Sequence, residues 1–160
     1  MATIKQRITP FLWFDGRAEE AAKFYASVFP NSKVVGMSHY DEATAKAAGR
    51  PPGSVMTVVF QLDGQELVAL DGGPHFKFTE AVSFVVNCES QAEIDHYWKA
   101  LSAGGQEVEC GWLRDRFGLS WQVVPAILEE LLLSGPEKSR RVMAAVLKMK
   151  KLDIEVLKSA

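Results

Sequence analysis

The residue types best suited to chemistry lie in one short loop, where His75 follows Asp71 by four positions. A carboxylate beside an imidazole orients the ring as a general base, so Asp71 and His75 form the candidate catalytic pair. An aspartate that directly precedes glycines also caps turns with its side chain. The sequence therefore leaves two interpretations of Asp71, an acid–base partner and a turn cap.

A second group of residues combines large aromatic rings with a few polar side chains. Such rings can line a flat apolar cavity, and isolated polar groups within it orient a bound molecule. The richest stretch is residues 111–125, where Trp121 and Gln122 lie on an alternating strand pattern. The alternative is that these rings are ordinary core residues of a half-buried strand. The candidate ligand-binding residues are Trp13, Phe76, Trp112, Asp115, Trp121 and Gln122.

Several other chemistries lack the residues they require. None of the three histidines has the spacing of a recognised metal motif, and neither Cys88 nor Cys110 has a basic neighbour that would mark a reactive thiolate. No nucleophile elbow, phosphate-binding loop or dinucleotide-binding glycine loop is present. We therefore expect free, reduced thiols and predict no cofactor.

The composition is that of an ordinary globular protein. The 160 residues are 48% hydrophobic and carry a formal net charge of −2, which gives no overall attraction to nucleic acid. No apolar run approaches the roughly 20 residues that span a bilayer, and the N-terminus lacks the apolar core of a secretion signal. We expect a cytoplasmic protein that binds neither nucleic acid nor membrane. The basic residues between Lys138 and Lys151 are interpreted as a solvated helix face, with an anion-binding patch as the alternative.

The elements that position these residues begin with a strand, a helix and three further strands. Asp15 is the expected N-cap of the helix, which ends before Pro30. A surface loop is expected at residues 41–53, and Asp63-Gly64 predicts a tight hairpin turn. The expected strands of this first half are residues 8–14, 33–40, 54–62 and 66–70.

The second half repeats this order of elements. Residues 81–88 predict a strand, Ser90 and Glu93 a capping box that opens a helix, and residues 106–110 a further strand before the hairpin at 111–125. A shift of 73 residues superposes the two halves. The matched order of five elements indicates an internal repeat. The pairs brought together are Phe11 with Phe84, Glu20 with Glu93, Phe24 with Tyr97, Tyr25 with Trp98 and Val28 with Leu101.

The pattern becomes helical after this repeat. Pro125 fits the first position of a helix that closes at Gly135-Pro136, a second helix is expected at residues 137–150, and Asp153 caps a short last one. Their apolar stripes need a surface to cover, either the outer face of a sheet or a second subunit. We expect a homodimer formed through the sheets and these helices.

Two βαβββ units in tandem resemble the vicinal oxygen chelate superfamily, which contains glyoxalase I, bleomycin-resistance proteins and extradiol dioxygenases. Residues 12–16, 69–74 and 111–125 resemble its PhnB-like subgroup, whose members often carry the name 3-demethylubiquinone-9 3-methyltransferase. The resemblance implies an α+β fold in which tandem βαβββ repeats form paired U-shaped mixed sheets. We expect one domain, residues 1–160, with modules at 6–74 and 80–125 and a helical extension at 126–160.

In the superfamily's enzymes a divalent metal lies between the two halves, held by His, Glu or Gln from the first and last strands of each unit. Only Gln122 among the matching positions is a usual ligand type, and a neutral amide alone cannot hold a transition metal. We therefore predict no metal site. The matching positions are Gln122, the neighbourhood of Val68, Ile8 or Thr9, and Ala81 or Val82.

The leading hypothesis is a protein that binds a small organic molecule in an aromatic cavity of its second half, without a metal. One alternative is an enzyme, either a metal-dependent lyase or dioxygenase that uses Gln122 with His75, or the methyltransferase of the subgroup's name. The methyltransferase interpretation lacks a glycine loop that would hold S-adenosylmethionine. A further alternative is a cavity filled by side chains in a protein that acts through its dimer surface.

Overall fold

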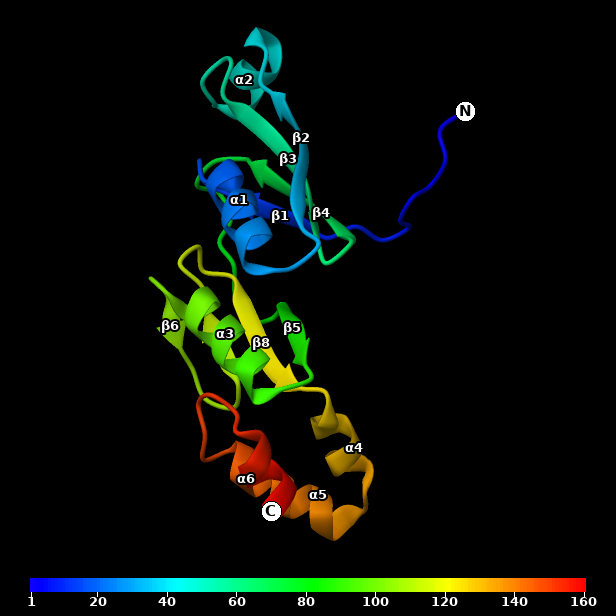
Figure 1. Ribbon diagram of the computed structural model, residues 1–160. Coiled ribbons are helices and arrows are strands. Elements are labelled where there is room, and N and C mark those ends of the chain that lie inside the picture. Colours follow the sequence, from blue (N-terminus) through cyan, green and yellow to red (C-terminus); the bar gives the residue numbers. More distant parts are fainter. The chain divides into compact units, whose positions relative to one another are not determined.

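The computed structural model describes residues 1–160, which divide into two compact units, Met1–Lys77 and Phe78–Ala160. Each unit carries one of the two predicted βαβββ repeats, so the chain has the predicted α+β fold (Figure 1). The first unit contains β1 (Phe11–Phe14), α1 (Ala18–Val28), β2 (Lys33–His39), α2 (Glu42–Ala48), β3 (Val55–Leu62) and β4 (Gln65–Asp71).

The first sheet is mixed and has the strand order β1-β4-β3-β2. β1 runs parallel to β4, whereas β4 with β3 and β3 with β2 form antiparallel pairs. Helix α1 packs on one face of this sheet, where Leu12, Phe14 and Phe60 are buried. On the opposite face Phe11 stays 59% exposed. The alternation along the strands thus separates a core face from a more open face.

Two sequence expectations for this unit have opposite outcomes. The Asp63-Gly64 turn is confirmed, because both residues have positive φ and join β3 directly to β4. The expectation of a surface loop at 41–53 is wrong over Glu42–Ala48, which is helix α2. The Asp41 side chain accepts a hydrogen bond from Thr44 N, the Thr44 side chain accepts one from Asp41 N, and an alanine-rich turn follows. The loop was predicted because of the Pro-Pro-Gly that follows, and this capping box was not recognised in the sequence.

The second unit repeats the sheet plan with two strands much shorter than their counterparts, at residues 106–107 and 112–114. Its sheet has the order β5-β8-β7-β6, with β5 parallel to β8, and α3 packs on it. The strand expected at 106–110 is only two residues long, since the chain turns at Cys110, where φ is 64°. The unit contains β5 (Ser83–Cys88), α3 (Gln91–Ser102), β6 (Gln106–Glu107), β7 (Trp112–Arg114), β8 (Ser120–Pro125), α4 (Ile127–Leu133), α5 (Pro136–Val146) and α6 (Ile154–Ser159).

The repeat has two registers, one for its helices and one for its strands. The helical register of 73 residues is confirmed, since Tyr25 and Trp98, like Val28 and Leu101, are buried at matching positions. The match of Phe11 with Phe84 is wrong, because Phe14 and Cys88 are the buried ends of β1 and β5 and lie 74 positions apart. The connection from strand to helix is one residue shorter in the second unit, so the strand register differs by one.

The C-terminal helices pack mainly on one another. Val142, Val146, Leu152 and Leu157 form a small buried core between α5, α6 and the segment that joins them. Pro125 is the last residue of β8 and not the first of a helix, so that expectation is wrong; α4 begins at Ile127. The second helix ends at Val146, before the expected Lys150.

Backbone hydrogen bonds join this extension to the rest of its unit. Cys110 N donates to Met149 O at 2.8 Å, and Gly111 N donates to Lys150 O at 2.7 Å. The Gln91 side-chain amide donates to Leu152 O and accepts from Ile154 N. The extension therefore docks on the hairpin that precedes β8 and on the start of α3.

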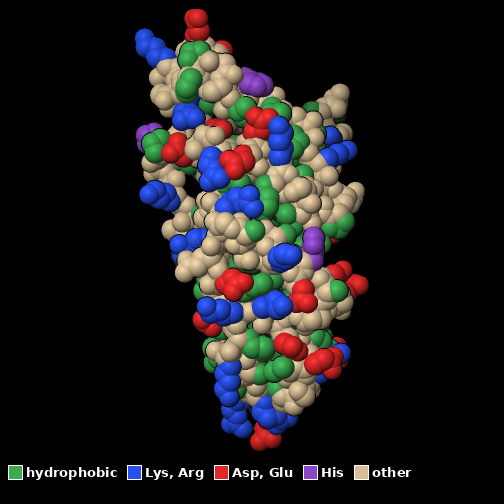
Figure 2. All heavy atoms as spheres, turned by 60° about the vertical axis from the view of Figure 1, so that its left-hand side comes forward, with side chains coloured by type: hydrophobic (Ala, Val, Ile, Leu, Met, Phe, Trp, Pro, Cys, Tyr) green, Lys and Arg blue, Asp and Glu red, His purple; other side chains and the backbone are tan.

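The surface and the helices set simple bounds. No helix has the length and the apolar character required to cross a membrane. Acidic and basic side chains are interspersed over the face shown in Figure 2. This mixture agrees with the small net charge of −2.

Candidate functional site

The first-module candidates meet around Gly73, just after β4. Trp13 pairs with Leu70 in the register of β1 and β4, on the sheet face that points away from α1. Its Nε1 donates to the Gly73 carbonyl oxygen at 2.9 Å, which fixes the indole across the end of β4. A methyl group on Gly72 would lie 2.2 Å from Cζ2 of this ring, so the close approach of Trp13 requires glycine there.

His75 and Phe76 add two rings to Trp13. The ring centroid of Phe76 lies 4.9 Å from that of Trp13 and the ring centroid of His75 lies 6.4 Å from it, both in edge-to-face arrangements. Phe76 is 66% exposed and Trp13 is half-buried. Large rings that hold one another at the surface offer contact area to a ligand. We call Trp13, His75 and Phe76 the aromatic cluster.

Asp71 is buried at the end of β4 and caps helix α1. Its Oδ1 accepts a hydrogen bond from Ala18 N at 2.8 Å, across 53 residues of sequence. The expectation that Asp15 caps this helix is wrong: the N-cap residue is Arg17, which makes no side-chain cap hydrogen bond. The cap of α1 comes from a distant strand, so no local motif announces it.

This geometry bears on the predicted catalytic pair. Burial raises the pKa of Asp71 above its usual 3.8, against the opposing effects of backbone hydrogen bonds at the start of α1 and the charge of Arg50. No hydrogen bond joins Asp71 to His75, whose exposed ring lies edge-on to Trp13. Asp71 therefore has a clear part in stabilising α1, and an acid–base role for Asp71 and His75 stays a prediction.

Arg50 joins the aromatic cluster from the turn after α2, and sequence reasoning missed it. A methyl group on Gly73 would lie 3.8 Å both from Arg50 Cδ and from the His75 ring. Arg50 Nη1 lies 3.8 Å from an Asp15 carboxylate oxygen, and the side chain is only 18% exposed. Its Nε is buried without a hydrogen-bond partner. The signal available in the sequence was Gly49, whose left-handed conformation ends α2 and turns the chain just before Arg50.

In the second module Asp115 and Trp121 form a buried polar pair. Asp115 Oδ2 accepts from Trp121 Nε1 at 2.8 Å, while its Oδ1 accepts from the backbone N–H groups of Phe117 and Leu119. Asp115 is 2% exposed and Trp121 is 3% exposed. The carboxylate thus organises the tip of the β7–β8 hairpin and holds the Trp121 ring, which lies edge-to-face with Phe84.

Trp112 and Gln122 lie on the other face of this sheet. They are opposite one another in the β7–β8 register, and both are half-buried. Gln122 Nε2 donates to Ser83 Oγ at 2.9 Å, and Val85, the β5 partner of Gln122, is 50% exposed. The structure therefore brings Trp112 and Gln122 together on an open face, whereas Asp115 and Trp121 lie in the interior.

The donor set at the superfamily's metal positions does not fit a metal. Val68 pairs with Phe11 as Gln122 pairs with Val85, so Val68 is the first-module counterpart of Gln122. An aliphatic side chain and an amide that already bonds a serine supply no anionic or imidazole ligand. Neither unit gathers three or more His, Cys, Asp or Glu side chains that could hold a metal ion.

The two cysteines are free thiols, as expected. Cys88 is 1% exposed, and burial raises its pKa from 9.0 to about 11. A thiol held neutral in this way is a poor nucleophile. Cys110 is half-buried against the small core of the C-terminal helices.

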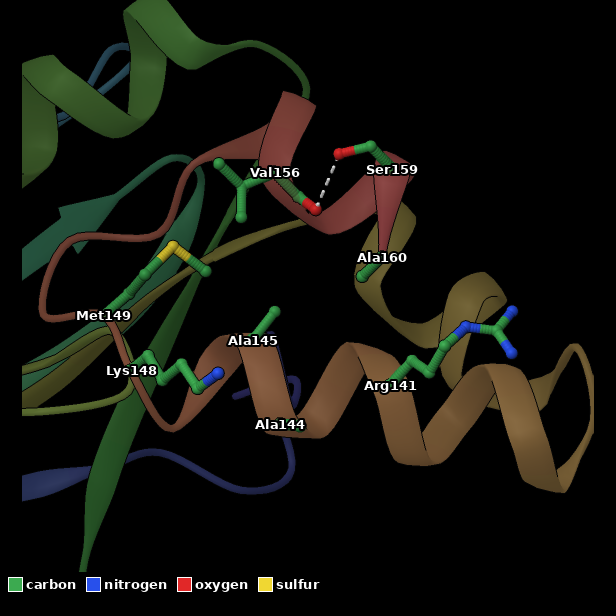
Figure 3. A pocket seen from close by; sticks show the side chains of 8 residues that line it. All are labelled: Arg141, Ala144, Ala145, Lys148, Met149, Val156, Ser159 and Ala160. Atoms are coloured by element: carbon green, nitrogen blue, oxygen red, sulfur yellow. Dashed lines mark hydrogen bonds between the residues drawn. The ribbon is translucent and has the colours of Figure 1, made fainter.

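A separate groove of about 460 Å³ lies between α5 and α6 (Figure 3). Ala144, Ala145, Met149 and Val156 give it an apolar lining, with Arg141 and Lys148 beside them. It contains none of the predicted site residues. The basic C-terminal segment is therefore not only a solvated face, because two of its cations border an apolar hollow.

Comparisons with known proteins identify relatives of the chain. The family model described as 3-demethylubiquinone-9 3-methyltransferase matches residues 6–124. The structure of a PhnB protein from Bacillus cereus, which also carries the name 3-demethylubiquinone-9 3-methyltransferase, is 39% identical with a TM-score of 0.68; the match covers 76% of this chain and 100% of that chain. No curated protein sequence matches.

More distant solved structures share the fold. The protein PA1353 from Pseudomonas aeruginosa is 22% identical with a TM-score of 0.60, over 76% of this chain and 98% of that one. The fosfomycin resistance protein FosX from Listeria monocytogenes, in complex with Mn(II) and sulfate ion, is 16% identical with a TM-score of 0.53, over 81% of this chain and 97% of that one. At these identities the likeness concerns the fold alone.

Proposed function

This chain belongs to the 3-demethylubiquinone-9 3-methyltransferase family, the PhnB-like branch of the vicinal oxygen chelate superfamily, and we propose that it binds a small organic molecule on an aromatic surface without a metal. The observation that carries the proposal is the aromatic cluster. Trp13 is held by its bond to Gly73 while Phe76 beside it remains 66% exposed. Pre-positioned rings bind a planar molecule at low entropic cost.

The open face of the second sheet supports the proposal independently. Trp112 supplies a half-buried ring, and Gln122, held by Ser83, supplies an oriented amide. A few fixed polar groups beside an aromatic side chain are typical of ligand sites. The proposed site residues are therefore Trp13, Phe76, Trp112 and Gln122, while Asp115 and Trp121 support the second surface from within.

The metal-free part of the proposal rests on the donor set. In FosX the name of the complex records Mn(II), whereas here Gln122 and its counterpart Val68 leave a manganese ion without anionic ligands. We also propose that the chain acts in the cytoplasm as a homodimer. Sedimentation at tens of micromolar tests the dimer, and a monomer there would refute it.

The four indole N–H signals in an NMR spectrum test the binding proposal, because the four tryptophans of the chain divide into two kinds. Trp98 Nε1 donates to Glu107 and Trp121 Nε1 donates to Asp115, both as buried rings. We expect millimolar indole or benzoate to shift the signals of Trp13, Trp112 or both, and to leave Trp98 and Trp121 in place. Four unchanged signals would overturn the proposal.

The methyl transfer in the family's name is tested separately. Calorimetry with S-adenosylmethionine is expected to give no heat of binding. Saturable heat of binding would favour the methyltransferase alternative over the binding protein that we propose.

A further inference from the structure

We propose that Arg50 binds the anionic group of the ligand, which would make the ligand a small aromatic carboxylate or a comparable planar anion. This inference rests on the proposed function, because it assigns a charge to the molecule that the aromatic cluster holds. It adds a specificity residue from the α2–β3 connection, which carries none of the predicted site residues.

The state of the guanidinium is the first argument. Arg50 is 18% exposed, and its Nε is buried without a hydrogen-bond partner. Buried charged groups are normally hydrogen-bonded, since the loss of hydration is costly otherwise. The Nε group is enclosed, but the outer Nη groups of Arg50 make no hydrogen bond within the protein, and a carboxylate can take two such N–H groups at once.

The two neighbouring carboxylates do not fill this fork. Asp15 is 56% exposed, and its oxygen lies 3.8 Å from Nη1, which is beyond hydrogen-bond distance. Asp71 Oδ1 is occupied by Ala18 N, and burial disfavours its charged form. Both carboxylates attract Arg50 through their charge without a hydrogen bond. An anionic ligand must therefore compete with the exposed Asp15 carboxylate for Arg50.

The position of Arg50 links its charge to the rings. Gly73 lies between them, since a methyl group there would be 3.8 Å from both Arg50 Cδ and the His75 ring. The Gly73 carbonyl in turn holds the Trp13 indole. A molecule that places its carboxylate on Arg50 would thus extend its ring toward Trp13 and Phe76. A cationic or neutral ligand would lose the contact with Arg50.

The test compares benzoate with its neutral analogue benzamide, using the Trp13 indole signal to measure binding. In the unmodified protein we expect benzoate to bind about tenfold more tightly than benzamide, the order of one charge-assisted hydrogen bond. Arg50→Met is expected to abolish this preference, and Arg50→Lys to retain part of it. Arg140→Met is the matched control, because Arg140 is a strongly exposed arginine of the other unit.

Asp15→Asn supplies a change in the opposite direction. Removal of the competing carboxylate should tighten benzoate binding about two- to threefold and leave benzamide unchanged. A merely structural Arg50 would not give this result. Equal affinity for benzoate and benzamide, or a response of Trp112 without one of Trp13, would overturn the inference and leave the proposed function standing. No response of either tryptophan to either probe would overturn both.

Discussion

The two modules share one plan and differ in how they secure the helix that covers their sheet. In the first, Asp71 at the end of β4 caps α1 from 53 residues away. In the second, Ser90 caps α3 from the residue just before it, accepting from Glu93 N at 3.2 Å. The strand registers make Pro125 the counterpart of Asp71, since these residues pair with Cys88 and Phe14. A proline has no acceptor side chain, so the second module needs its local cap.

This difference extends to the surfaces beside the helices. The turn that follows Asp71 carries His75 and Phe76 of the aromatic cluster and lies close to Arg50, whereas the chain after Pro125 continues into α4. The first module thus uses the end of its last strand for the proposed binding surface. The second uses the same end to attach a helical extension.

The largest expected effect separates the tryptophans of the two modules. Trp121→Ala should lower the free energy of unfolding by about 3 to 5 kcal/mol, because the ring is 3% exposed and holds Asp115. Trp13→Ala removes a half-buried ring and should cost about 1 to 2 kcal/mol. Urea unfolding measures the stability loss of both variants. The response to ligand should be lost only in the Trp13 variant. Equal losses would show that Trp13 is a core residue.

The two caps give the next largest effect. Asp71→Ala leaves buried N–H groups at the start of α1 without an acceptor and should cost about 2 to 3 kcal/mol. Ser90→Ala removes an exposed local cap and should cost about 1 kcal/mol. Thermal and urea unfolding compare the variants. A smaller loss for Asp71→Ala than for Ser90→Ala would contradict the structural role assigned to Asp71.

The charge of Asp71 predicts a pH dependence confined to the first module. Burial raises its folded pKa above 3.8, so the native state binds this proton more tightly than the unfolded state. The contribution of Asp71 to the free energy of unfolding must then fall as the pH rises from 3.8 through the raised folded pKa. Asp71→Asn keeps an oxygen acceptor and should remove this fall. Unfolding of both proteins below pH 3.8 and at neutral pH checks it, and parallel profiles would refute the raised pKa.

The smallest expected effect concerns Gln122, which Gln122→Val would convert to the residue type of its counterpart Val68. The loss of the bond to Ser83 should cost about 1 kcal/mol or less. Titration with Mn(II) should give the same weak response in both proteins. Weaker Mn(II) binding by the variant would make Gln122 a ligand and overturn the metal-free proposal.

The sequence predicted what is encoded locally or by periodicity. The order of the βαβββ elements, the Asp63-Gly64 turn and the Asp153 cap, which accepts from Val156 N, are confirmed. The failures lie where a distant partner decides. Asp15 was predicted as the cap of α1 because an aspartate just before a helix is a typical N-cap. In the folded chain the Asp71 side chain accepts the hydrogen bond from Ala18 N instead. Arg50 could not be placed at the site, because its approach to Gly73 is a tertiary contact that no local pattern encodes.

The long-range cap on α1 also orders the events of folding. A helix whose cap lies on a strand 53 residues later cannot complete its first turn until that strand has joined the sheet. The first module should therefore gain its helix and its sheet in one cooperative step, with little residual helicity in shorter nascent chains. Helix α3 carries its own cap and can begin to form as soon as it is synthesised, before any partner strand arrives.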